Sequence, residues 1–119
     1  MAWQFTADAP IYLQAAEMLK LRILTGTYPP GGAVPPVREL AQEAAVNPNT
    51  MQRSLSLLEQ EGLLTTQRTA GRRVTEDREQ IARLRRRLAG EILNRCRVQL
   101  SALGYTQAEI SALMQEVEA

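Results

Sequence analysis

The two-residue link Ala45-Val46 constrains the fold of this chain more than any other feature, because a helix start follows it immediately. Asn47 is a favoured N-cap residue, and Pro48 is a favoured first helical residue. The segment before the link has apolar residues at three- and four-residue spacing, which predicts a short helix after Pro35-Pro36. A short helix, a tight link and a capped helix are the order of a helix-turn-helix.

Further signals predict the elements on either side. An apolar stripe predicts a helix over residues 10–25, and residues 28–32 are typical of a turn. The capped helix runs to Gly62, and residues 63–66 and 73–75 form a hairpin around Thr69-Ala70-Gly71. A long helix is expected from residue 76 to 103. Thr106 and Glu109 form a capping box that begins a last helix with Ile110, Leu113, Met114 and Val117 buried.

These elements predict a mainly α fold with a small β-hairpin wing. We expect a winged helix-turn-helix DNA-binding domain at residues 1–75 and a two-helix C-terminal dimerisation region at residues 76–119. The 119 residues carry no histidine, which removes the commonest general base and metal ligand. No nucleophile or phosphate-loop motif is present, so the sequence predicts neither an enzyme nor a cofactor or metal site.

Charge is unevenly distributed along the chain. Residues 68–97 carry ten basic and four acidic side chains, although the whole chain has a net charge of +1. Such asymmetry is typical of a polyanion partner or of charge pairing within the molecule. With a single cysteine, Cys96, and no signal peptide or membrane span, we expect a cytoplasmic protein with an inert, buried thiol.

The helix that begins at Pro48 has the chemistry of a DNA-recognition helix. Met51, Leu55 and Leu58 form its inward face. Its other face shows Asn49, Thr50, Gln52 and Arg53 near the N-terminus, where recognition helices contact base edges. Asn and Gln pair with adenine, and Arg pairs with guanine, in the major groove. The alternative is an ordinary polar surface.

Several separate segments resemble the N-terminal domain of GntR-family regulators. These are Pro10-Ile11-Tyr12-Leu13-Gln14, Gly31-Gly32, and the runs at residues 36–41, 46–53 and 58–64. The resemblance covers about residues 10–75. The form Asn47-Pro48-Asn49-Thr50 resembles the short YtrA-like branch, whose tail has only two helices and no large effector domain.

The resemblance implies which residues contact double-stranded DNA. The start of the second helix and of the recognition helix would bind it, and the wing tip would enter the minor groove or rest on phosphates. Carried over by position, the candidates are Arg38, Asn47, Asn49, Thr50, Gln52, Arg53, Arg68, Gly71 and Arg72. The chain departs from the family at Pro36, where Ser is common, and in the wing, which loses one glycine and gains two arginines.

The tail is too apolar to stand alone. Its stripe comprises Ile81, Leu84, Leu88, Ile92, Cys96, Leu100 and Leu103, with all but Cys96 as candidate dimerisation residues. We expect a second copy to cover it by two-fold packing; the alternative is a monomer whose tail folds onto its own winged domain. The arginines at positions 83 and 85–87 flank the stripe. We favour a solvated or intradimer role for them over a DNA or ligand site.

The sequence therefore predicts a DNA-binding transcription regulator, in the first instance a repressor, acting as a homodimer on a pseudo-palindromic operator. One alternative is a winged-helix protein-interaction or assembly module without sequence-specific DNA binding. Another is the N-terminal part of a larger pyridoxal-enzyme-type regulator, which the chain's end at residue 119 disfavours. The operator, the regulated genes and any small-molecule effector are not predicted by the sequence.

Overall fold

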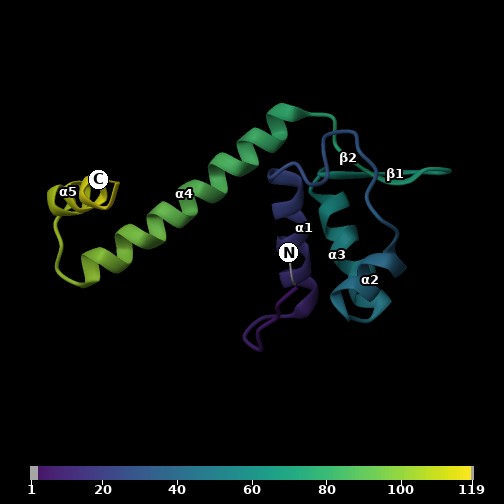
Figure 1. Cartoon of the computed structure of the whole chain (residues 1–119), viewed down its shortest axis with the longest axis horizontal. Helices are drawn as coiled ribbons and strands as arrows, with labels where there is room; N and C mark the ends of the chain where they lie inside the picture. Colours follow the sequence, from purple (N-terminus) through teal and green to yellow (C-terminus); the bar gives the residue numbers. More distant parts are fainter. Residues whose placement is uncertain (1–2, 119) are drawn as a thin grey trace. The chain divides into compact units, whose positions relative to one another are not determined.

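The computed structural model describes residues 3–118, and these form helices and one antiparallel hairpin (Figure 1). The elements in order are α1 (Ile11–Leu24), α2 (Val37–Ala44), α3 (Pro48–Gln60), β1 (Leu64–Gln67), β2 (Gly71–Val74), α4 (Arg78–Ala102) and α5 (Gln107–Glu118). The predicted mainly α class with a hairpin wing is confirmed. The chain divides into two compact units, Met1–Ala82 and Arg83–Ala119, and α4 contributes residues to both.

The core of the first unit lies around α3, which packs against both α1 and α2. The predicted inward face of α3 is confirmed, since Met51, Leu55 and Leu58 are fully buried. Each neighbouring helix buries most of its predicted stripe, in which Tyr12 and Val37 are only half-buried: Ala15, Ala16, Leu19 and Ile23 from α1, and Leu40, Ala41 and Ala44 from α2. Small and aliphatic side chains therefore fill the core of this chain, which has few aromatic residues.

The link between α2 and α3 is as tight as the sequence predicts. Ala45 takes the left-handed conformation (φ 57°, ψ 44°), which turns the chain within one residue. The Asn47 side chain then accepts a hydrogen bond of 2.8 Å from the Asn49 backbone N–H, and Pro48 opens the helix. Gly62, with φ of 79°, ends the C-terminal turn of α3, as predicted.

The hairpin pairs β1 with β2 in antiparallel register, from Leu64 opposite Val74 to Gln67 opposite Gly71. Its first strand begins one residue later than predicted, because the Leu63 N–H bonds back to the Leu58 carbonyl at the end of α3. Gly71 takes φ of 72° and closes a three-residue loop, a common hairpin geometry. A segment before α2 also pairs with β2, through Ala33 opposite Arg73, which the sequence pattern did not predict.

An N-terminal arm lies against the first unit. The Trp3 indole N–H donates to the Glu43 carboxylate of α2, and the Arg22 guanidinium of α1 lies 4.8 Å from the centre of the Trp3 ring. Gln14 of α1 donates hydrogen bonds to the carbonyls of Thr6 and Ala9, at 2.9 and 2.7 Å. The arm is therefore tied to two helices of the unit.

Helix α4 begins two residues later than predicted, because Asp77 caps it: its carboxylate accepts a hydrogen bond of 3.1 Å from the Gln80 N–H. The capping box before α5 is confirmed by reciprocal hydrogen bonds between Thr106 and Glu109, at 2.9 and 3.2 Å. Among residues 3–118, no helix combines the length and apolarity needed to cross a bilayer.

Candidate nucleic-acid interface

The first turns of α3 present a polar face to solvent. Asn49, Gln52 and Arg53 are exposed, and Thr50 is half-buried. The opposite face of the helix is buried in the core, so α3 is fixed in rotation about its own axis. The four side chains predicted to meet base edges therefore lie on one outward-facing surface, at the N-terminal end of the helix.

A hollow of about 420 Å³ lies between the starts of α1 and α3. It is lined by Ile11, Tyr12, Asn49, Thr50 and Arg53, so it joins part of the predicted polar face to the first turn of α1. The guanidinium carbon of Arg53 lies 3.7 Å from the centre of the Tyr12 ring, which is a close cation–π contact. The sequence analysis named Tyr12 in the segment that resembles the GntR family, but it did not predict this contact.

Two further candidates lie at helix starts. Arg38 is exposed in the first turn of α2, and none of the ion pairs seen within residues 3–118 includes it. Asn47 is exposed as well, but its side-chain oxygen already accepts the cap hydrogen bond from Asn49. The Asn47 side chain thus caps the N-terminus of α3, and the cap fixes the position of the residues that follow.

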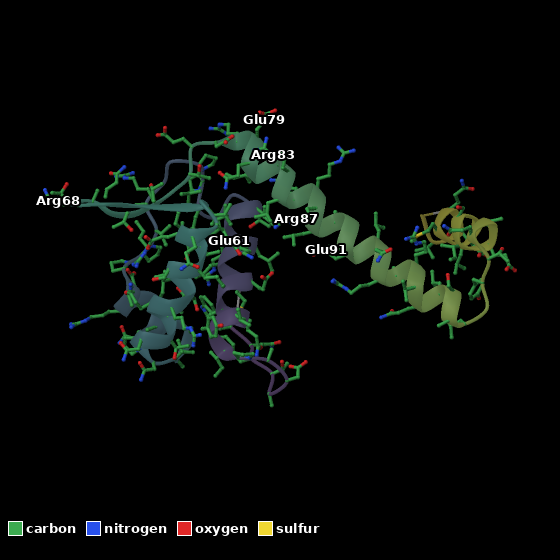
Figure 2. The ribbon with its side chains drawn as sticks, turned by 180° about the vertical axis from the view of Figure 1, so that it is seen from behind. Glu61, Arg68, Glu79, Arg83, Arg87 and Glu91 are labelled. Atoms are coloured by element: carbon green, nitrogen blue, oxygen red, sulfur yellow. The ribbon has the colours of Figure 1, made fainter. Side chains whose placement is uncertain are left out.

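The wing carries the remaining candidates, and it holds them differently. Arg68 is exposed in the hairpin loop, and Figure 2 shows it at the tip. Arg72 instead forms an ion pair with Glu59 of α3, through its Nε atom. The Thr66 hydroxyl donates to the other oxygen of the same carboxylate, at 2.7 Å. Glu59 therefore joins both strands of the wing to the recognition helix, a role that sequence reasoning did not assign.

The surroundings of Glu59 lower the pKa of its carboxyl below the ordinary value of 4.5. Partial burial acts in the opposite direction, but the hydrogen bonds from Thr66 and Arg72, together with the charge of Arg72, outweigh it. A carboxyl whose pKa is depressed by folding stabilises the folded state above its unfolded pKa. That stabilisation is lost as the pH falls through the folded pKa.

Glu59→Gln is therefore expected to destabilise the protein near neutral pH and to have a shrinking effect as the solution is acidified below about pH 4.5. Urea unfolding at pH values from 7 to about 3, followed by circular dichroism, measures this for both proteins. Glu116→Gln, which removes an exposed carboxylate from α5, serves as the matched control. An equal loss at every pH would contradict the assignment of the effect to the charge of Glu59.

The predicted dimerisation residues differ in burial. Ile81 and Leu84 are buried, and Leu88 and Leu100 are half-buried, whereas Ile92 and Leu103 are 58% and 75% exposed. The expectation that α5 buries four side chains is partly wrong: Ile110 is buried, but Met114 is 39% and Val117 is 82% exposed. The second unit thus leaves apolar side chains of both helices in solvent, because two helices alone cannot cover one another's apolar faces.

Comparison with known proteins places the chain among bacterial regulators. Residues 11–74 match the family described as bacterial regulatory proteins, gntR family. The uncharacterized HTH-type transcriptional regulator YhcF of Bacillus subtilis is 37% identical over 90% of this chain and 88% of its own length. The HTH-type transcriptional repressor YtrA of the same organism is 38% identical over 60% of this chain and 55% of its own length.

Solved structures agree with this placement. A GntR family transcriptional regulator from Listeria monocytogenes superposes with a TM-score of 0.87 at 34% identity, over 94% of this chain and 98% of its own. The N-terminal domain of AraR, solved with a mutant operator, has a TM-score of 0.55 at 27% identity, over 59% of this chain and all of its own. The chain thus belongs to the gntR family of DNA-binding transcription regulators, whose members are not enzymes.

Proposed function

We propose that the protein is a repressor that binds a pseudo-palindromic DNA operator as a homodimer. The observation that carries this proposal is the outward face of α3, which has amide and guanidinium groups at its exposed N-terminal end and a fully buried opposite side. A helix held in this way inserts its first residues into the major groove. The structure of the AraR N-terminal domain with an operator supports DNA as the partner.

The homodimer is supported by the apolar residues of the second unit. Ile92 and Leu93 of α4, Leu103 just beyond its end and Val117 of α5 are each more than half exposed in the single chain. Side chains of this size are costly to leave in water, and a second copy of the same surface covers them by two-fold symmetry. In this proposal residues 76–119 are the dimerisation region, and residues 1–75 are the DNA-binding domain.

The two kinds of DNA contact fall to different residues. Asn49, Thr50 and Gln52 read base edges, while Arg38 and the wing arginines Arg68 and Arg72 bind phosphates. Asn47 and Gly71 act indirectly, since one caps α3 and the other closes the wing loop. Repression follows if the bound dimer excludes polymerase from a promoter. The similarity to YtrA, a transcriptional repressor, supports that direction of regulation.

Selection of bound fragments from a random duplex pool tests the proposal, because it yields the site, its symmetry and its half-site spacing together. We expect two inverted half-sites about one helical turn apart. The logarithm of the affinity is expected to fall with the logarithm of salt concentration, with a slope of about −0.9 for each phosphate contacted. No enrichment, together with no binding at low salt, would overturn the proposal in favour of a protein-interaction module.

A further inference from the structure

Tyr12 contacts the recognition helix from outside it. Its ring belongs to the first turn of α1, and the guanidinium carbon of Arg53 lies 3.7 Å from the ring centre. This distance places the cation over the face of the ring rather than beside its edge. One face of the guanidinium therefore stacks on the ring. Its N–H donors lie in the plane of the group and stay available to a ligand.

The position of Tyr12 relative to α3 is fixed by a buried hydrogen bond next to Arg53. Ser54 is fully buried, and its hydroxyl lies 2.7 Å from the Tyr12 backbone carbonyl. The Thr50 carbonyl, at 3.2 Å, is the more distant acceptor for the same hydroxyl. A fully buried hydroxyl keeps its hydrogen bond because losing it is costly. The two helices are thus joined at the residue that follows Arg53.

Because the Arg53 side chain is already held by the Tyr12 ring, binding of a ligand costs less of its conformational entropy. A free arginine side chain loses substantial rotamer entropy when it is immobilised, and a stacked guanidinium has lost part of it already. The stacked group also lies at the hollow lined by Asn49 and Thr50, at the N-terminal end of α3. A guanidinium held with its N–H donors free, at a hollow beside the start of a helix, matches the acceptor oxygens of a phosphate.

We propose that Tyr12 is a positioning residue that holds Arg53 for a phosphate of the DNA backbone, so that Arg53 does not read a base. The stack holds the guanidinium against the first turn of α1, at a hollow that Gln52 does not line. This inference rests on the proposed DNA-binding function and assigns one phosphate contact in each half-site to a pair of residues on different helices.

A double-mutant cycle tests the inference, with wild type, Tyr12→Leu, Arg53→Ala and the double variant titrated against the selected duplex at several salt concentrations. Arg53→Ala is expected to raise the Kd at least tenfold in a dimer and to reduce the salt slope by about 0.9 in each half-site. Tyr12→Leu is expected to raise the Kd about threefold to tenfold in wild type, and to have no effect in the Arg53→Ala background. Equal effects of Tyr12→Leu in both backgrounds would overturn the inference.

Two conservative variants separate positioning from folding. Tyr12→Phe keeps the aromatic face and is expected to bind as wild type does, whereas Arg53→Lys keeps the charge but loses the planar stack and is expected to bind more weakly with an unchanged salt slope. These variants keep the inference testable if Tyr12→Leu fails to fold, which the fluorescence of Trp3 reports. Wild-type affinity in Arg53→Lys would overturn it.

A panel of duplexes, each with one altered base pair, distinguishes phosphate from base contact. The order of affinities across the panel is expected to be the same for Arg53→Ala as for wild type, because a phosphate contact carries no sequence information. Relaxed preference at a single base pair would overturn the inference and assign Arg53 to base reading. The failure of wild type to bind any duplex would instead refute the proposed function.

Discussion

Replacing Ile92 with aspartate is expected to convert the proposed dimer into monomers and to raise the Kd for the selected duplex about a hundredfold or more. Ile92 is 58% exposed in the single chain, so a carboxylate there costs the monomer little. In a two-fold interface each copy would bury one such charge without a partner, which disfavours association strongly. Separate monomers then bind the half-sites independently, so the second binding event no longer gains from the high local concentration that a dimer provides.

Light scattering and fluorescence anisotropy measure the two parts of this expectation. Asn94→Asp is the matched control, because it adds the same charge two residues away, on the opposite side of α4, where Asn94 already accepts a hydrogen bond from Arg97. We expect this control to remain dimeric and to keep its affinity. A dimeric Ile92→Asp protein would show that another surface joins the two copies.

Leu55→Ala is expected to lower the free energy of unfolding of the first unit by about 2–5 kcal/mol. The Leu55 side chain is fully buried on α3, the helix that packs against both α1 and α2. Truncation removes apolar contacts and leaves a cavity that helices joined by so tight a turn cannot close. Since domains of this size are stable by about 5–15 kcal/mol, such a loss is a large part of the total.

Urea unfolding followed by the fluorescence of Trp3 measures this loss. Trp3 is the only tryptophan in the chain, and it contacts Glu43 of α2 and Arg22 of α1, so it reports on the first unit. Leu21→Ala removes the same atoms from a half-exposed position on α1, and we expect it to change the stability by less than about 0.5 kcal/mol. Similar losses in the two variants would contradict the central position given to Leu55.

Local chemistry made much of the fold predictable. Asn47 and Pro48 define a helix start because the Asn47 side-chain oxygen accepts a hydrogen bond from the backbone N–H two residues later, as an N-cap does. Thr106 and Glu109 do the same for α5, through bonds that span only three residues. The buried stripes of α1, α2 and α3 followed from helical periodicity. The family was recognisable from the same segments, since they carry the turn and the caps.

Contacts between distant segments were not predictable in this way. The stack of Arg53 on Tyr12 and the ion pair of Arg72 with Glu59 join residues on different elements. No periodicity or spacing relates such residues; only the packing of α3 against α1 and of the wing against α3 brings them together. The sequence therefore did not distinguish Arg53 and Arg72 from Arg38, whereas in the structure Arg53 stacks on Tyr12 and Arg72 pairs with Glu59.

The left-handed conformation of Ala45 has a consequence for the stability of the protein. A residue with a side chain in the left-handed conformation costs about 1–2 kcal/mol relative to the right-handed one, and glycine escapes that penalty. The bend between α2 and α3 is thus made at some expense to the folded state. Ala45→Gly would relieve this strain at an exposed position without altering the buried core, so a single substitution could raise the stability of the protein toward heat.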